Sequence, residues 1–268
     1  MAKSSTWDLF KKTDIPSSLV LSEDTIKKYL SEAKTVVDLG CGFGKNTLLL
    51  AHYFTHVIGI DISQNSIHYA KQCVAKERLK NVAFQIDDVE LLQTISTNSA
   101  DGVVAIALFT TLAHKNPIKE LAIQLNTFET MNRILKLNGI IILQDFLLNP
   151  RTKLYKERYR KGLAQGYRFG TFFVERDNSS YLAHHFNGSK KLNELIEMAN
   201  LTGFIVIKEK QSKALSRSGN SVNEVFLVLK KNTQIDKETM VYSQKKQLLI
   251  QKLLTFKSSL NKLSAALE

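Results

Sequence analysis

Three glycines and one aspartate in this 268-residue chain have the spacing of a ligand-binding turn. Gly40, Gly42 and Gly44 lie between a short β-branched run and a Leu-rich helical pattern. Glycine lets a ligand approach the backbone amides at a helix N-terminus, which suits a carboxylate or a phosphate. Asp61 ends the next apolar run, where a carboxylate can accept hydrogen bonds from two ribose hydroxyls. The spacing therefore favours a ligand that contains a ribose.

Apolar runs alternate with helical patterns around this turn. The predicted strands are 35–39, 56–60, 81–86, 102–106, 139–143, 203–207 and 224–229. The predicted helices are 23–30, 46–53, 63–79 and 189–199. Because helices connect the first five strands through right-handed crossovers, these strands form a mainly parallel sheet. The last two strands flank a polar loop at 211–220 and predict an antiparallel pair at one edge of the sheet.

The glycine turn differs from a dinucleotide fingerprint, which needs its third glycine where this chain has Lys45. Val37–Gly44 instead resembles the first motif of class I S-adenosylmethionine-dependent methyltransferases. Further segments resemble later motifs of that family in the same order: Ile58–Ser63, Asp87–Glu90, Asp101–Val104 and Arg133–Gly139. In the last of these, Leu137-Asn138-Gly139 replaces the more usual Pro-Gly-Gly. The resemblance implies a Rossmann-like, seven-stranded, mostly parallel α/β sheet with helices on both faces.

The same resemblance implies S-adenosylmethionine as the cofactor and S-adenosylhomocysteine as its product. Asp38 either supports the turn or contacts the cofactor's amino group, Asp61 holds the ribose, and Ile62 lies against the adenine. Asp88 accepts from the adenine amino group, with its neighbour Asp87 as the alternative. The remaining implied contacts come from the turn, the third motif and the end of the fourth strand: Gly40, Cys41, Gly42, Gly44, Val89, Ala105 and Ala107.

The catalytic candidates lie in the second half of the chain. Methyl transfer from a sulfonium is an in-line displacement that needs a general base only when the acceptor is protonated. His184 and His185, with Tyr181 nearby, resemble an acceptor-facing segment of the small-molecule branch. A histidine with a pKa of about 6.5 can take a proton from an amine or hydroxyl. In the alternative interpretation, one of the two histidines packs in the core or caps the following helix.

Aromatic and cationic residues are the candidates for acceptor contacts, and they are Trp7, Phe109, Tyr159, Tyr167 and Arg168. Arg168 can hold a carboxylate or phosphate, or lie in a solvated basic loop. Trp7 belongs to a lid over the cofactor or docks a short helix on the body. The sequence contains no set of cysteines and histidines at zinc-binding spacing, so no metal is predicted.

The formal net charge of +12 lies entirely after residue 150. Residues 1–150 carry 15 basic and 15 acidic side chains, residues 151–230 carry 15 and 7, and residues 231–268 carry 7 and 3. The basic excess therefore belongs to the acceptor side and the tail, which favours an acidic acceptor or partner.

Two features argue against nucleic-acid subtypes of the family. Ile106–Phe109 stands where base-amine enzymes carry a Pro-Pro-aromatic motif. Both cysteines, Cys41 and Cys73, precede the fourth strand, whereas a pyrimidine-C5 enzyme needs a nucleophilic cysteine after it. The prediction is methyl transfer to an O or N atom of a small molecule. An RNA or protein methyltransferase and an inactive cofactor-binding partner subunit are the alternatives.

The domain prediction places the methyltransferase domain at 1–234, with a lid at 1–30 and an aperiodic acceptor-side insertion at 150–188. Residues 235–268 form an amphipathic helical tail with leucines at spacings of four and three. This tail packs on its own domain, forms a homodimer or lies on a membrane surface. Two cysteines and the lack of an apolar signal core predict a cytoplasmic protein, with nucleic acid and membranes as less favoured partners.

Overall fold

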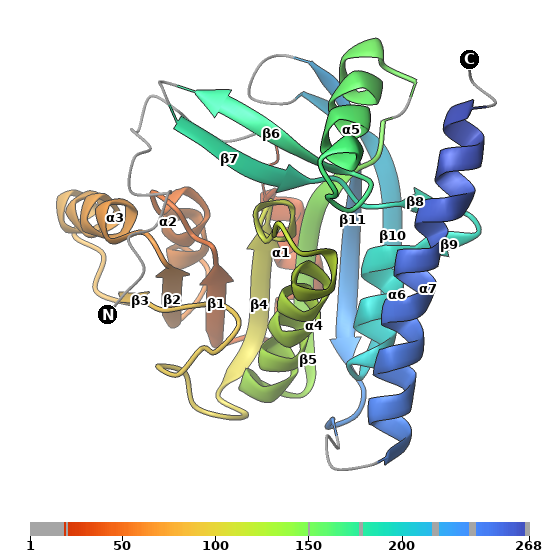
Figure 1. Ribbon diagram of the computed structural model, residues 1–268. Coiled ribbons are helices and arrows are strands. Elements are labelled where there is room, and N and C mark those ends of the chain that lie inside the picture. Colours follow the sequence, from red (N-terminus) through yellow and green to blue (C-terminus); the bar gives the residue numbers. More distant parts are fainter. Residues whose placement is uncertain are drawn as a thin grey trace.

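The computed structural model describes residues 19, 21–149, 151–176, 179–215, 220–235 and 240–265, with side chains omitted at a few of these. Trp7 and most of the predicted lid lie outside the described residues. A seven-stranded sheet with the order β10-β11-β5-β4-β1-β2-β3 forms the centre of the molecule (Figure 1). Its strands are β1 Thr35–Leu39, β2 His56–Asp61, β3 Val82–Ile86, β4 Ala100–Ile106, β5 Leu135–Leu147, β10 Phe204–Leu215 and β11 Ser221–Lys231.

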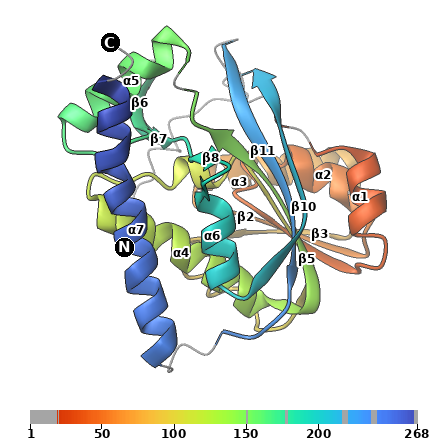
Figure 2. The same ribbon diagram turned by 90° about the vertical axis from the view of Figure 1, so that its right-hand side faces the viewer.

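The first five strands are parallel, and β11 runs antiparallel to both of its neighbours, β5 and β10. The predicted Rossmann-like α/β fold with an antiparallel pair is confirmed. Helices cover both faces of the sheet (Figure 2). One face carries α1 Glu23–Tyr29, α2 Lys45–Ala51 and α3 Gln64–Glu77, and the other carries α4 Pro117–Ile134, α6 Glu194–Leu201 and α7 Met240–Ala265. Because both faces are covered, β1 and β4 are nearly continuous buried runs.

Local signals account for the helix starts. The Ser22 hydroxyl accepts a hydrogen bond from the Thr25 amide, and the Ser63 hydroxyl accepts one from the Ser66 amide. The Asn116 side chain accepts from two amides of the first turn of α4, where Pro117 occupies the first helical position.

Two predicted boundaries were wrong. Gln211–Leu215 belongs to β10 rather than to a polar loop, because these residues pair with Ser221–Val225 of β11 at the exposed edge of the sheet. The helix predicted from residue 189 begins at Glu194 instead. A short hairpin of β8 Gly188–Ser189 and β9 Leu192–Asn193 precedes it, and the Asn193 side chain caps its first turn.

The insertion without visible periodicity is also ordered. It consists of α5 Lys153–Ala164 and an antiparallel hairpin of β6 Thr171–Arg176 and β7 Ser179–His184. The hairpin crosses above the carboxyl ends of the parallel strands, where ligands bind in open α/β sheets (Figure 1).

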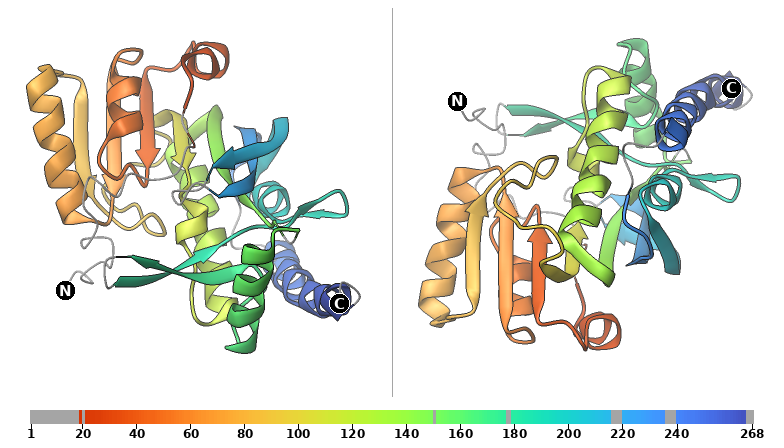
Figure 3. Two further views of the ribbon diagram at one scale, coloured as in Figure 1. Left: turned by 90° about the horizontal axis from the view of Figure 1, so that it is seen from above. Right: turned by 90° about the horizontal axis from the view of Figure 1, so that it is seen from below.

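The described part of α7 packs on its own domain, beside α4 and α6 (Figure 3). Leu249 and Leu253 are buried in the main core. The Lys246 ammonium lies 2.7 Å from a Glu129 carboxylate oxygen, which also accepts from the Tyr242 hydroxyl. The first of the three interpretations of the tail therefore holds for these residues. Within the described ranges, no helix is long and apolar enough to cross a membrane.

Lys231 binds the carbonyl groups at the carboxyl end of α4. Its buried ammonium donates to the carbonyls of Asn132 and Leu135, each at 2.7 Å, and to the Asn98 side chain at 3.1 Å. We expect Lys231→Met to lower the free energy of unfolding by about 2–3 kcal/mol, because buried carbonyls lose their donors. Urea unfolding measures this change. Lys230→Met, at the neighbouring half-buried position, is the control and should change stability by less than about 0.5 kcal/mol. Equal changes in the free energy of unfolding for the two variants would contradict the stabilising role of the Lys231 hydrogen bonds.

Candidate active site

The glycine turn leaves room for a ligand on one side only. Gly40, Gly42 and Gly44 all have positive φ angles, in the left-handed region that favours glycine. A Cβ atom at Gly40 would lie 2.8 Å from the Leu108 side chain, so this glycine is needed for packing. A Cβ atom at Gly42 would meet nothing within 4 Å. The backbone at Gly42 therefore faces open space, as a cofactor-binding turn requires.

Asp61 joins this turn to the end of β2. One of its carboxylate oxygens accepts the Gly42 amide at 2.8 Å, and the other accepts the Ser63 amide at 2.8 Å. The Cys41 amide donates to the Ile60 carbonyl at 2.9 Å, so it is already used within the protein. Ile62, next to Asp61, is exposed despite its apolar side chain. The half-buried carboxylate and the exposed isoleucine fit the ribose and adenine contacts predicted for them.

Asp38 lies buried behind the turn. Its carboxylate accepts a hydrogen bond of 2.6 Å from the Thr47 hydroxyl of α2. Burial raises the pKa of Asp38 to about 7, the Thr47 hydrogen bond opposes the rise, and the charge of Asp61 adds to it. This position favours support of the turn over direct contact with a ligand. Burial also raises the pKa of the Cys41 thiol, so it is a packed thiol rather than a reactive one.

Asp87 and Asp88, the two acidic residues after β3, differ in the hydrogen bonds that their carboxylate oxygens accept. Asp87 accepts the Asp88 amide at 2.8 Å through one oxygen and the amide and hydroxyl of Thr94 through the other. Asp88 accepts the Glu90 amide through one oxygen only. Since Asp88 keeps the freer carboxylate, the geometry favours Asp88 over Asp87 as an adenine contact. Val89 is buried, and its carbonyl accepts from the Thr130 hydroxyl at 2.7 Å.

The chain turns sharply where β4 ends. Ala105 is fully buried in the strand, whereas Ala107 has a φ of 55°, which costs a residue other than glycine about 1–3 kcal/mol. The Ala107 amide donates to the Gln144 carbonyl of β5 at 2.8 Å. This turn brings Leu108 against Gly40 and directs the following 3-10 helix, η3 Phe109–Thr111, toward the insertion.

Arg168 holds the insertion on the body through four polar contacts. Its guanidinium donates to Glu120 of α4 at 2.6 Å, to Glu194 of α6 at 3.1 Å and to Gln124 at 3.1 Å. A fourth contact, at 2.7 Å, joins Arg168 to a ring nitrogen of His184. The prediction that Arg168 holds an anionic acceptor is not supported, because two buried internal carboxylates already neutralise it.

His184 has no nitrogen free for catalysis. Arginine only donates hydrogen bonds, so Nε2 of His184 accepts from Arg168 and the ring proton resides on Nδ1. Nδ1 lies 2.8 Å from the Thr171 hydroxyl. Burial lowers the pKa of His184 to about 3, and the charge of Arg168 lowers it further against the influence of Glu120. His184 is thus a neutral structural residue, in agreement with the packing interpretation.

His185 has a different environment. Its Nδ1 lies 2.6 Å from the Tyr159 hydroxyl, and its ring packs against Phe146, Tyr155 and Phe172. Burial lowers the pKa of His185 to about 3, followed by the influence of His184. A buried histidine that stays neutral at pH 7 is a poor proton acceptor.

The other residues predicted near the methyl acceptor are mostly buried in the protein interior. Phe109 is fully buried among Phe128 and Phe186, so it belongs to the core rather than to a ligand-facing surface. Tyr159 and Tyr167 are also buried, whereas Tyr181 is half-buried on β7.

Two carboxylates were missed at the sequence level. Glu120 resembles an ordinary acidic residue in the first turn of a helix. Asp145 lies just after the predicted strand 139–143, where an acidic residue is ordinary. It is nevertheless fully buried, and its carboxylate accepts hydrogen bonds from the amides of Thr110 and Phe146 at 3.1 and 2.8 Å. Burial raises the pKa of Asp145 to about 7. Neither residue carries a local signal that reveals its distant partner.

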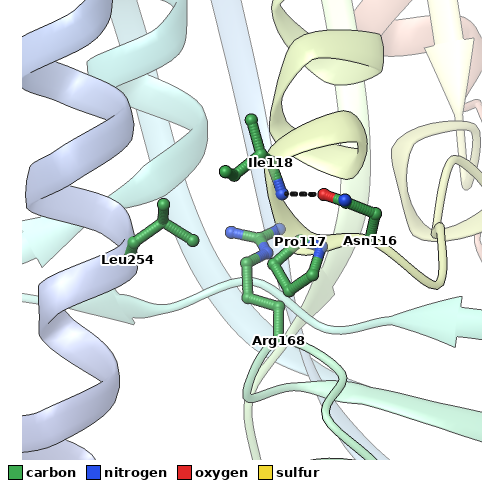
Figure 4. Close-up of a pocket in the computed structure, with 5 residues that line it drawn as sticks. All are labelled: Asn116, Pro117, Ile118, Arg168 and Leu254. Atoms are coloured by element: carbon green, nitrogen blue, oxygen red, sulfur yellow. Dashed lines mark hydrogen bonds between the residues drawn. The ribbon is translucent and has the colours of Figure 1, made fainter.

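A hollow of about 350 Å³ lies between the start of α4, Arg168 and α7 (Figure 4). Its lining residues are Asn116, Pro117, Ile118, Arg168 and Leu254. None of them belongs to the glycine turn or to the predicted cofactor contacts. Among the described side chains, no group of histidine, cysteine, aspartate and glutamate is arranged to hold a metal ion.

The fold and the glycine turn define a class I S-adenosylmethionine-dependent methyltransferase. The chain belongs to the family described as "Methyltransferase domain", whose model matches residues 30–257. A solved structure of S-adenosylmethionine-dependent methyltransferases from Methanosarcina mazei is 25% identical, with a TM-score of 0.70 over 80% of this chain and 99% of that one.

Two curated relatives match over shorter stretches. The Saccharomyces cerevisiae protein named "Probable S-adenosylmethionine-dependent methyltransferase CRG1" is 36% identical over 34% of this chain and 31% of its own length. Phosphoethanolamine N-methyltransferase 2 of Caenorhabditis elegans is 27% identical over 65% of this chain and 33% of its own length. The match thus spans about a third of each of these two relatives. S-adenosylmethionine is the cofactor of the family.

The Arg168 cluster predicts a large difference between a buried and a surface ion pair. Arg168→Met should lower the free energy of unfolding by about 3–5 kcal/mol, because Glu120 and Glu194 would remain buried without a cation. Lys161→Met breaks the exposed pair with Glu157 and should have little effect. Urea unfolding compares the two variants. A decrease in the free energy of unfolding below about 1 kcal/mol for Arg168→Met would show that the cluster does not hold the insertion on the body.

Proposed function

We propose that this protein transfers the methyl group of S-adenosylmethionine to an O or N atom of a small, acidic acceptor molecule. The main support is the ordered insertion, whose hairpin crosses above the carboxyl ends of the parallel strands, the end of the sheet at which the glycine turn follows β1 (Figure 1). An insertion in this place covers a bound acceptor and keeps water from it. A small acceptor fits such a covered site better than a polymer does.

S-adenosylmethionine supplies a methyl group that its sulfonium already activates. The residues proposed to hold it are those with open or partly exposed polar groups at the strand ends. The Gly42 backbone faces the ligand, Asp61 accepts from the ribose, Ile62 covers the adenine and Asp88 accepts from the adenine amino group. Ala105 and Ala107 border the methyl group from the end of β4. Positioning by these groups lowers the entropic part of the barrier.

The charge of the insertion supports the acidic acceptor. On α5, the exposed Lys153, Arg160 and Lys161 accompany one acidic residue, Glu157. Arg158 lies 5.5 Å from the Tyr155 ring centre, and so continues the basic surface toward the aromatic cluster. A cationic rim raises the local concentration of anionic molecules.

Asp61→Ala should weaken binding of S-adenosylmethionine at least about tenfold, because a hydrogen bond to a charged group contributes about 1.5–3 kcal/mol. Isothermal titration calorimetry measures the affinity. Asp24→Ala, on the exposed first turn of α1, is the control and should bind normally. Unchanged affinity for the folded Asp61→Ala protein would reject the site.

Incubation with methyl-labelled S-adenosylmethionine and separate pools of metabolites, RNA and protein tests the acceptor class. We expect label in the metabolite pool, and more in its anion-exchange fraction. Label in RNA or protein would replace the small-molecule proposal. Calorimetric binding of the cofactor without label in any pool would indicate a non-catalytic cofactor-binding subunit.

A further inference from the structure

Tyr159 and His185 form a buried hydrogen-bonded pair in the insertion. The Tyr159 hydroxyl lies 2.6 Å from His185 Nδ1 and accepts the Asn149 amide at 3.3 Å. Tyr159 is completely buried, so its single hydroxyl proton needs an acceptor inside the protein. Among the described residues, His185 Nδ1 is the acceptor within hydrogen-bond distance. Tyr159 therefore donates and Nδ1 accepts.

This direction determines the tautomer of His185. A neutral imidazole carries one proton, and because Nδ1 accepts, the proton is on Nε2. Burial keeps the ring neutral. Three aromatic rings pack around it, with centroids 4.8 Å away for Phe172, 5.1 Å for Tyr155 and 5.6 Å for Phe146. Such packing opposes a ring flip that would move Nδ1 away from the Tyr159 hydroxyl. In the described part of the chain, Nε2 has no hydrogen-bond partner.

His184 has the opposite tautomer. Arg168 forces its Nε2 to accept, so its proton is on Nδ1. Two adjacent histidines thus carry their protons on different nitrogens, each determined by a different neighbour. The difference gives the pair a spectroscopic signature that does not depend on activity.

The backbone around His185 is tied to the elements that border the cofactor site. The His184 carbonyl accepts the Thr110 hydroxyl at 2.7 Å, and the Thr110 amide donates to Asp145 of β5 at 3.1 Å. The Phe186 amide donates to the Phe146 carbonyl at 3.0 Å. His185 is therefore fixed relative to the loop after β4, where the methyl group is expected.

We infer that Tyr159 makes His185 a hydrogen-bond donor through Nε2, and that this donor binds an anionic oxygen, a carboxylate or a phosphate, on the acceptor. His185 then orients the acceptor and takes no proton from it. Tyr159 is a positioning residue that acts through His185. The inference rests on the proposed function for its acceptor, whereas the tautomer follows from the geometry of the protein alone.

Nitrogen-15 correlation spectra of histidine-labelled protein at pH 7 test the tautomer. We expect His185 to carry its proton on Nε2 and His184 on Nδ1, with signals assigned through His185→Gln and His184→Gln. Tyr159→Phe should shift His185 toward a mixture of tautomers and leave His184 unchanged. Tyr155→Phe, a ring stacked 6.0 Å from Tyr159 on the same helix, is the matched control and should change neither. A proton on Nδ1 of His185 in the unmodified protein would overturn the inference, even if the protein proves to be an active methyltransferase.

Kinetics with the acceptor that takes up the label test whether His185 Nε2 acts as a hydrogen-bond donor. Glutamine keeps an N–H donor but is no base at neutral pH, whereas phenylalanine has neither property. His185→Gln should retain most of kcat/KM, and His185→Phe should lose about 10- to 100-fold, mainly through the KM of the acceptor. Both variants should bind S-adenosylmethionine normally by calorimetry. Equal loss of kcat in both variants would indicate a base and overturn the inference.

Acceptor analogues separate the two anionic groups. Conversion of a carboxylate to its methyl ester, or of a phosphate monoester to its dimethyl ester, should raise KM in the unmodified protein but not in His185→Phe. Equal increases in both proteins would show that His185 does not contact the anion. If no pool accepts label, the proposed function fails, and the nitrogen-15 spectra still decide the tautomer.

Discussion

The packing of the second half of this chain depends on one buried cation. Arg168 joins a glutamate at the start of α4, a glutamate at the start of α6 and a histidine of the hairpin, and these side chains are almost inaccessible to solvent. A buried guanidinium costs several kcal/mol unless its charge and donors are satisfied, and here four polar contacts and two carboxylates do so. The cluster has one positive and two negative groups. Burial raises the pKa of Glu194, which relieves part of this imbalance.

The Arg168 cluster connects elements that are far apart in the chain. The same two helices that supply its carboxylates carry α7 on their outer side, through Glu129 of α4 and Glu197 of α6. The tail helix, the two helices and the insertion thus form one packed unit. Dimerisation through the rest of the leucine stripe stays a prediction, because those side chains lie outside the described residues.

The half of the chain that carries the glycine turn has a different charge distribution. Its net charge is zero, yet two carboxylates border the glycine turn: Asp61 accepts from the Gly42 amide, and Asp38 lies buried behind the turn. Burial holds the pKa of Asp38 near neutrality, at about 7, so a nearby cation stabilises its carboxylate form. The basic excess lies after residue 150, where it includes the exposed cations of α5 in the insertion. The two halves of the chain therefore differ in charge, with acidic groups at the glycine turn and a basic excess on the insertion and the tail.

The sequence alone determined the central strands, the glycine turn, the class of the protein and the starts of the first three helices, because apolar periodicity, glycine conformation and capping act between near neighbours. It also placed Asp61, whose role depends on its position at a strand end. The structure decided between residues of the same type. It separated Asp88 from Asp87 and His185 from His184, and it moved Arg168 and Phe109 into the interior. Arg168 meets Glu120 across 48 residues of chain, and Thr110 meets His184 across 74. Such contacts form only when the whole chain has folded, since no local pattern specifies which distant group neutralises a buried charge.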